Sequence, residues 1–205
     1  MSRAARRGLP PTATIAQITM SLDGYVTGPG DGPGCGLGVG GEQLHYWVVE
    51  GPWSYDAEPT GEATGVDKEY LDASLARLGA VIGGQGTFEA ADRWGGRNPW
   101  DVPFFVLTHR RDEPPPGFTF VDDLATALLR ARAAAGAKDV VVMGGADVIR
   151  QALAAREVDQ LEISVAPVIL GGGKRLFDGF GQTVPLEQAD ALRSPWATHL
   201  RYRVV

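Results

Sequence analysis

The apolar residues of this chain gather in short runs that are separated by stretches with a helical pattern. Runs rich in β-branched and aromatic residues, whose apolar positions are not confined to one face, are typical of strands buried in a parallel sheet. Such runs predict four strands, at residues 14–20 (TIAQITM), 80–83 (AVIG), 103–107 (PFFVL) and 140–143 (VVVM). A short strand is also predicted at 118–121, and residues 160–165 (QLEISV) alternate as a strand with one wet face does.

Apolar residues three and four positions apart predict amphipathic helices between these strands. A helix is predicted at 66–78, where one face carries Tyr70, Leu71, Leu75 and Leu78. Another begins after Asp122 or Asp123, since an aspartate suits the cap position, and it ends near Gly136. Shorter helices are predicted at 42–49 and 87–91.

The order of these elements indicates the fold class. Strands that alternate with helices form α/β folds, with a parallel sheet and right-handed crossovers. Residues 187–192 and 199–205 have the pattern of a closing hairpin, which adds an antiparallel strand at the C-terminal edge. We therefore expect a three-layer α/β domain over residues 14–205, with a central, mostly parallel sheet and helices on both faces. Residues 1–13 are basic, and we expect a disordered tail there.

The stretch 140–153 (VVVMGGADVIRQAL) joins a buried strand to a helix through Gly144 and Gly145. Glycine lets the backbone turn sharply and approach a ligand closely. A helix N-terminus offers unpaired N–H groups and a positive dipole end to a phosphate. The stretch therefore fits an anion site, but it fits equally a tight turn that needs glycine only for its dihedral angles.

Three such junctions follow neighbouring strands, at 84–87, 108–111 and 144–148. The carboxyl ends of parallel strands meet at one edge of a sheet, where α/β proteins bind their ligands. Two of the junctions present helix N-termini and one presents cations. A ligand with several phosphates would satisfy all three, and this convergence favours the binding-site interpretation.

Composition narrows the choice of partners. The formal net charge of −6 argues against general binding to nucleic acid or to anionic membranes. The single cysteine, Cys35, excludes an intramolecular disulfide and a cysteine-cluster zinc site, and it fits a reducing cytoplasm. Residues 28–41 are dense in glycine and proline and predict an irregular loop, for which a lid is one role. The sequence GLGVGG in this loop matches the dinucleotide-binding pattern, but the match is discounted because no strand precedes it.

Five motifs, in this order and spacing, resemble the dihydrofolate-reductase-like superfamily, most closely the reductase domain at the C-terminus of the bifunctional riboflavin-biosynthesis protein. The motifs are ITMSLDGYVTG, VIGGQGTFEA, PFFVLTHRR, VVVMGGADVIRQAL and VAPVILGGGKRLF. The resemblance runs from about residue 14 to residue 205. It implies a stand-alone NADPH-dependent reductase that forms a homodimer and binds no metal, since the zinc ligands of the deaminase half are missing.

The resemblance also implies which residues bind NADPH. The glycine pair is joined by a cis peptide in the family, and the turn at 84–87 touches the adenosine phosphates, although Gln85 replaces the usual basic residue. The segment at 108–111 would hold the adenine and the 2′-phosphate, where Arg110 and Arg111 can form charge-assisted bonds; two surface arginines are the plainer alternative. The implied cofactor-binding residues are Gly84, Gln85, Gly86, Thr87, Thr108, His109, Arg110, Arg111, Met143, Gly144, Gly145, Ala146, Asp147, Val148 and Ile149.

The reaction that the resemblance implies is hydride transfer from the nicotinamide to a C=N or C=O carbon of a small pteridine, pyrimidine or related conjugated molecule. Asp23 is the best single candidate for the acid, with an Asx-type turn as its structural alternative. Glu42 and His45 are weaker candidates, and Lys174 and Arg175 are the nearby cations for a substrate phosphate. The proposed walls of the substrate site are Tyr46, Trp47, Leu170 and Gly171.

Two alternatives to a reductase stay open at this point. A non-catalytic nucleotide-binding module would keep the NADPH cleft and lack the acid, and the poor match at 42–49 to the helix that carries the acid in folate reductases favours it. A flavin-binding redox protein is the third possibility, because a phosphate cleft does not specify the ring attached to it.

Overall fold

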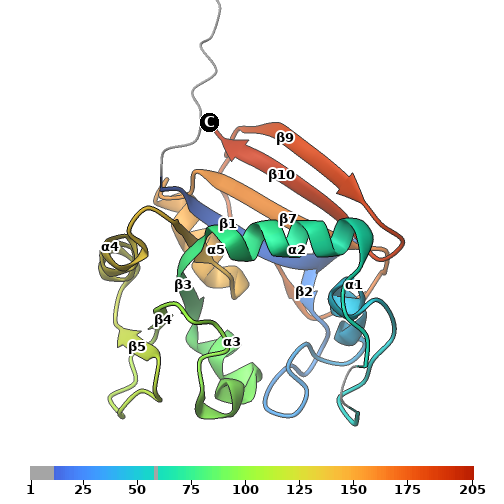
Figure 1. Ribbon diagram of the computed structural model, residues 1–205, viewed down its shortest axis with the longest axis horizontal. Coiled ribbons are helices and arrows are strands. Elements are labelled where there is room, and N and C mark those ends of the chain that lie inside the picture. Colours follow the sequence, from blue (N-terminus) through green and yellow to red (C-terminus); the bar gives the residue numbers. More distant parts are fainter. Residues whose placement is uncertain (1–11, 58–59) are drawn as a thin grey trace, which may run out of the picture.

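The computed structural model describes residues 12–57 and 60–205, and an eight-stranded sheet forms its centre (Figure 1). The strand order is β5-β4-β3-β6-β1-β7-β10-β9, and β10 alone runs in the direction opposite to the other seven strands. The strands are β1 (Thr14–Ser21), β3 (Leu78–Gly84), β4 (Phe104–Leu107), β5 (Phe118–Val121), β6 (Asp139–Val142), β7 (Gln160–Ala166), β9 (Leu186–Arg193) and β10 (Thr198–Val204). The expected α/β fold with a mostly parallel sheet and an antiparallel C-terminal edge is thereby confirmed.

Helices cover both faces of this sheet. On one face α4 (Leu124–Ala135) and α5 (Ala146–Ala154) bury an aliphatic core against β1, β3, β6 and β7. On the other face α3 (Gln85–Ala90) and the 3-10 helix η2 (Asp92–Gly96) enclose an aromatic core around Phe88, Phe104 and Phe118. Farther along the same face, α2 (Gly65–Arg77) crosses in front of β1 and β7 (Figure 1).

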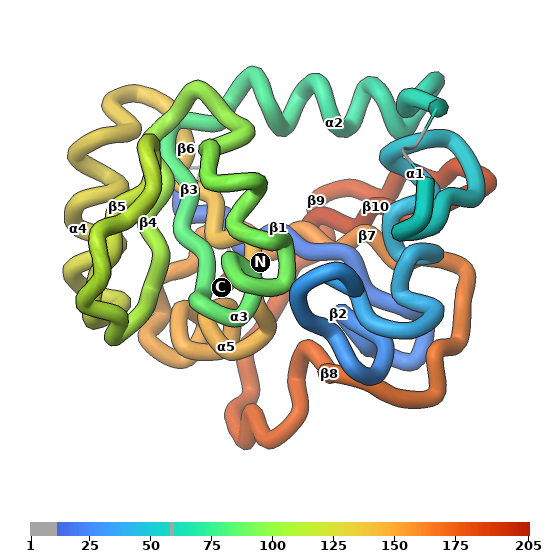
Figure 2. The backbone as a smooth tube through the Cα atoms, turned by 90° about the horizontal axis from the view of Figure 1, so that it is seen from below, coloured from blue at the N-terminus to red at the C-terminus, as the bar shows by residue number. Residues whose placement is uncertain are grey.

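A small lobe lies beside the ends of β1 and β7. The two-stranded ribbon of β2 (Tyr25–Thr27) and β8 (Lys174–Arg175) belongs to it, together with η1 (Gly41–His45) and α1 (Tyr46–Val49). The glycine-rich loop at 28–41 is held by its own backbone, since Gly28 N donates to Leu37 O at 2.7 Å. Figure 2 shows this loop and β8 close to α3 and α5, which places the lobe at the carboxyl ends of the central strands.

Several boundaries differ from the sequence expectation. The predicted helix at 66–78 ends at Arg77, because Leu78 is already extended and opens β3, and Leu75 is exposed. Asp123 rather than Asp122 caps α4, with its Oδ1 accepting the Thr126 amide at 2.8 Å. The alternation in β7 does not mark a wet face, because Glu162 and Ser164 are buried at 1% and 2% exposure beneath α2.

The expected tail at 1–13 falls mostly on residues 1–11, which lie outside the described part of the chain. The last two residues of that range make hydrogen bonds: Thr12 Oγ1 donates to Gly136 O at 3.1 Å and Ala13 N donates to Asp139 Oδ1 at 2.8 Å. Among residues 12–57 and 60–205 there is no helix with the length and apolar character needed to span a bilayer.

Candidate cofactor and substrate cleft

A cleft of about 1460 Å³ opens at the carboxyl ends of the central strands. Its walls come from β1, β3, β6, α2, α3 and the loop at 28–41. Pockets for a single small molecule measure roughly 300–1,000 Å³. The cleft is therefore large enough for an extended ligand and a second molecule beside it.

Most of the residues predicted to bind a cofactor line this cleft. They are Gly84, Gln85, Gly86, Thr87, Thr108, His109, Met143, Gly144, Gly145, Ala146, Asp147 and Val148. These residues come from three separate junctions of the chain, which the strand order places side by side. The convergence of the junctions, inferred from the sequence, is thus present in the fold.

The junctions after β3 and β6 are in direct contact. Gly84 N donates to Gly144 O at 2.8 Å, and the peptide bond between Gly144 and Gly145 is cis. A Cβ atom on Gly84 would lie 2.9 Å from Cγ2 of Val148, and one on Gly145 would lie 3.2 Å from Oγ1 of Thr87. A side chain at Gly84 would force Val148 to shift, and the two junctions form a tightly packed floor between β3 and β6.

The N-terminus of α5 faces the cleft with its backbone donors available. The helix begins at Ala146, and no described side chain caps it. The first backbone hydrogen bond of the helix runs from Ile149 N to Gly145 O, at 3.3 Å. The amides of Ala146, Asp147 and Val148 consequently lack intrahelical partners, which is the arrangement that binds a phosphate.

Arg110, the cation predicted to hold a 2′-phosphate, is already engaged with carboxylates. Thr108 Oγ1 donates to Gln85 Oε1 at 2.7 Å, which ties the junction after β4 to α3. Arg110 donates to both carboxylate oxygens of Asp112 at 2.7 Å and to Glu89 Oε1 at 2.8 Å. Arg110 is not among the residues that line the cleft, and two carboxylates neutralise its guanidinium.

Two other predicted cofactor residues lie apart from the cleft. Ile149 is 0% exposed and packs in the aliphatic core, and its N–H is already bonded to Gly145 O at 3.3 Å. Its place among the cofactor-binding residues stays a prediction, and this geometry weighs against it. The Arg111 side chain is 75% exposed and donates to Asp122 at 2.8 Å. This is the geometry of a surface ion pair, the plainer alternative weighed for this residue.

Asp23 joins the first turn to the loop that follows β7. Its carboxylate accepts a hydrogen bond from Ser21 Oγ at 2.6 Å, from Leu170 N at 3.1 Å and from Gly171 N at 2.8 Å. These bonds, with that from Ser21 the strongest, lower the pKa of Asp23 to about 2. Asp23 is not among the residues that line the cleft. Its role as the acid stays a prediction, and this geometry weighs against it.

Of the four residues predicted to form the walls of the substrate site, one lines the cleft and three do not. Trp47 lines the cleft, and its Nε1 donates to Thr19 Oγ1 at 3.2 Å. Tyr46 instead packs edge-on against Trp196, with ring centroids 6.0 Å apart, and is not a lining residue. Leu170 and Gly171 give their amides to Asp23 and also lie outside the lining.

The remaining titratable candidates are distributed around the rim. His45 lines the cleft, and burial lowers its pKa to about 4, so it is neutral at pH 7 rather than titrating near neutrality. Glu42 does not line the cleft. Lys174 and Arg175 do, although Lys174 is paired with Asp31 at 2.6 Å. The described ranges contain no group of three or more His, Cys, Asp or Glu side chains arranged to hold a metal.

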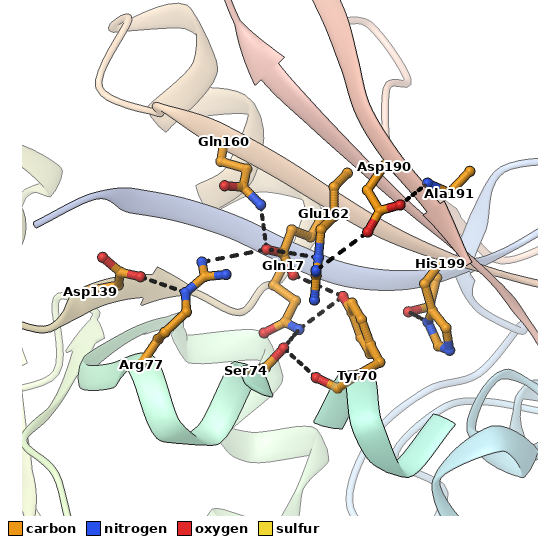
Figure 3. A network of polar contacts seen from close by, with 12 residues as sticks. Gln17, Tyr70, Ser74, Arg77, Asp139, Gln160, Glu162, Asp190, Ala191 and His199 are labelled. Atoms are coloured by element: carbon orange, nitrogen blue, oxygen red, sulfur yellow. Dashed lines mark hydrogen bonds and ion pairs between the residues drawn. The ribbon is translucent and has the colours of Figure 1, made fainter. Parts of the chain in front are cut away.

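Sequence reasoning missed a polar set on the floor of the cleft below α2. Figure 3 shows Tyr70, Ser74 and Arg77 reaching from α2 to Gln17 and Glu162 on the sheet. Gln17, Thr19, Ser74 and Ser164 all line the cleft. The available signal was the alternation of polar residues at 160–165, which the sequence pattern alone indicates as a solvent-exposed face.

The fold is shared with proteins of known structure. No curated protein sequence matches the chain. A putative riboflavin biosynthesis protein from Shewanella sp. PV-4 has a similar structure, with a TM-score of 0.68 at 22% identity over 95% of this chain and 99% of the other. Dihydrofolate reductase from Enterococcus faecalis, complexed with NADP(H), gives 0.60 at 13% identity over 96% and 98%.

A pyrimidine reductase-like protein from Corynebacterium diphtheriae gives a TM-score of 0.58 at 17% identity, over 95% of this chain and 92% of the other. At these identities the likeness concerns the fold. The model of the RibD C-terminal domain family matches residues 12–199, which is nearly the whole chain. The chain therefore belongs to the RibD C-terminal domain family.

Proposed function

We propose that this protein is an NADPH-dependent reductase that reduces a C=N or C=O bond of a small pteridine, pyrimidine or related conjugated molecule. The observation that carries the proposal is that one cleft is lined by the contacting glycines of two junctions (Gly84 and Gly145), by Thr87 and by the uncapped N-terminus of α5. Family membership supports it, and so do the reductases among the similar structures.

The residues present fit such a cofactor. The amides of Ala146, Asp147 and Val148 would bind the pyrophosphate, with the Thr87 hydroxyl beside them. Nothing lies within 4 Å of a Cβ placed on Gly86, so the backbone there is open to close approach by a ligand. Thr108 and Arg110 would hold the adenosine end. The cofactor supplies the hydride when bound, and the protein positions it and excludes water.

The half of the cleft under α2 would receive the substrate. Trp47, Leu71 and Leu75 line it with apolar surface, and the floor carries hydroxyl and amide groups. The lining residues from β1, α2 and β7 include no carboxylate among those described. We infer that the proton that accompanies the hydride comes from water held by these neutral groups.

The missing carboxylate is also the observation that favours a second candidate, a nucleotide-binding module without reductase activity. The absorbance of NADPH distinguishes the two. Its oxidation in the presence of dihydrofolate, a pterin or a ribosylamino-pyrimidinone is expected for the reductase alone. Binding of NADPH without oxidation by any of these would leave the binding module. A coloured, flavin-containing preparation would contradict both.

A homodimer is a further part of the proposal, since the family resemblance implies it. Light scattering after gel filtration is expected to give twice the chain mass of 21.8 kDa. A mass of one chain at micromolar concentration would remove this part of the proposal and leave the cofactor assignment untouched.

A further inference from the structure

Two buried carboxylates lie behind the floor of the substrate half of the cleft. Glu162 is 1% exposed and Asp67 is 4% exposed. The strand register aligns Gln17 with Glu162 and Thr19 with Ser164 across β1 and β7, and Ser164 with His199 across β7 and β10. Two rows of hydrogen-bonded polar side chains therefore start at the cleft. The first runs from Gln17 through Tyr70 to Glu162, and the second runs from Ser164 through His199 to Asp67.

The first row fixes the side-chain amide of Gln17. Tyr70 Oη donates to Glu162 Oε2 at 3.0 Å, and Arg77 and Arg201 lie 3.5 and 3.6 Å from Glu162 Oε1, as a buried charge requires. Burial, followed by the charge of Glu162, raises the pKa of Tyr70, so the phenol keeps its proton and must donate it to the carboxylate.

Because the phenol donates to Glu162, it can only accept from Gln17. Gln17 Nε2 lies 3.0 Å from Tyr70 Oη and 3.2 Å from Ser74 Oγ, so both of its N–H donors are used. Its Oε1 atom accepts no hydrogen bond within the described residues and is not among the buried unsatisfied atoms. Since Gln17 lines the cleft, this oxygen is the acceptor that it offers there.

The second row fixes the hydroxyl of Ser164. His199 Nε2 lies 2.7 Å from Asp67 Oδ1, and its Nδ1 lies 2.8 Å from Ser164 Oγ. A carboxylate accepts only, so Nε2 carries the proton; burial lowers the pKa of His199, which leaves Nδ1 as an acceptor. Ser164 must then donate to His199. Its oxygen also contacts the Tyr70 hydroxyl, whose proton is given to Glu162, and Ser164 faces the cleft as an acceptor.

We propose that Gln17 and Ser164 recognise an N–H donor edge of a planar substrate ring, and that Tyr70–Glu162 and His199–Asp67 act as positioning pairs that hold both groups as acceptors. This inference rests on the proposed function and adds that the ring edge of the substrate donates hydrogen bonds to the cleft floor. A ring that offers acceptors instead of donors at this edge would leave two floor oxygens without partners, which costs affinity.

The test uses the full chain and two uncharged probes of equal shape, pterin and 2-methyl-4-oxopteridine. They differ by an amino group that donates and a methyl group that does not. We expect the wild type to bind pterin about five- to tenfold more tightly, the value of one to two hydrogen bonds. Ser164→Ala and Gln17→Leu should each reduce this ratio to about twofold or less.

Asp67→Asn tests the positioning role, since an amide can donate as well as accept and no longer holds His199 in one tautomer. It should lower the ratio while thermal unfolding shows a folded protein. Ser164→Thr keeps the hydroxyl and should keep the ratio. Ser194→Ala, at the turn between β9 and β10 outside the cleft lining, is the matched control and should also keep it.

Equal binding of the two probes by the wild type, or binding of neither, would overturn the inference. An unchanged ratio in both Ser164→Ala and Gln17→Leu would do the same, and an unchanged ratio in Asp67→Asn alone would remove the positioning role. NADPH binding, followed separately by its fluorescence, distinguishes these outcomes from failure of the proposed function, because a protein that binds NADPH but shows no ring preference fails only here.

Discussion

Arg110 Nη1 lies 2.8 Å from Glu89 Oε1, and the same oxygen accepts a hydrogen bond from Gln85 Nε2 at 3.1 Å. Asp112 binds the other side of the guanidinium. The cation available for a 2′-phosphate is therefore shared with two carboxylates, and a phosphate must compete with them.

Replacing Glu89 by Gln should raise the affinity for NADPH relative to NADH by several-fold. The substitution removes the carboxylate charge while keeping an acceptor for Gln85. The dissociation constants of both cofactors, measured by fluorescence at low and high salt, give the ratio. The gain should shrink at high salt, since the interaction is between partly exposed charges; a ratio that does not move would show that Glu89 does not face the 2′-position.

The two neighbouring arginines provide a matched pair. Arg110→Ala should weaken NADPH more than NADH by roughly tenfold, as expected for the loss of a charge-assisted bond. Arg111→Ala should change neither affinity measurably, because its side chain is 75% exposed and pairs with Asp122 on the surface. Equal weakening of both cofactors by Arg110→Ala would remove the assignment of the 2′-phosphate to this residue.

Two glycines in the same turn should respond oppositely to alanine. Gly84→Ala should destabilise the fold by about 1–3 kcal/mol, the usual cost of overpacking, since its Cβ would lie 2.9 Å from Val148 Cγ2. Gly86→Ala meets nothing within 4 Å and lies in α3, where alanine is favoured by up to about 1 kcal/mol.

The thermal midpoint and the NADPH dissociation constant of both variants form the measurement. Gly86→Ala is expected to raise its thermal midpoint slightly and to lose NADPH affinity, because its methyl group enters the space left for the cofactor. Full affinity in a stable Gly86→Ala protein would place the cofactor elsewhere.

Asp23→Asn should remove a pH-dependent part of the stability. The pKa of Asp23 falls from 3.8 to about 2, chiefly through the bond from Ser21. A lowered pKa stabilises the fold above pH 4, and this contribution is lost as the pH falls toward 2. The urea midpoint of the variant should be lower than that of the wild type at pH 7, and the difference should close between pH 4 and pH 2.

His45→Gln should weaken the dependence of stability on pH between pH 6.5 and pH 4. Burial lowers the pKa of His45 from 6.5 to about 4, so the neutral ring favours folding above pH 6.5 and that advantage is lost toward pH 4. The midpoint of the wild type is therefore expected to fall across this window more steeply than that of the variant. Parallel curves would mean that the ring is solvated in the folded protein. NADPH binding at pH 7 should be unchanged in either case.

Much of the fold, and the convergence of three chain junctions at the cleft, could be predicted from the sequence. Runs such as 140–143 are strands because their apolar residues are local signals of burial, and parallel strands necessarily bring their carboxyl ends together. The Gly144–Gly145 pair and Thr87 were identified correctly as cleft residues for that reason. Ile149, which the family resemblance added to the set, does not line the cleft, because it lies on the apolar face of α5 that packs against the sheet.

The sequence by itself determined which segments are strands, which are helices, and that three glycine- or arginine-bearing junctions share one edge of the sheet. Only the tertiary structure decided that the polar face of β7 is buried, that Arg110 is neutralised and that Asp23 holds a loop. The physical reason is that polar partners come from anywhere in the chain. His199 binds Asp67 across 132 positions, and no local pattern specifies such a pair.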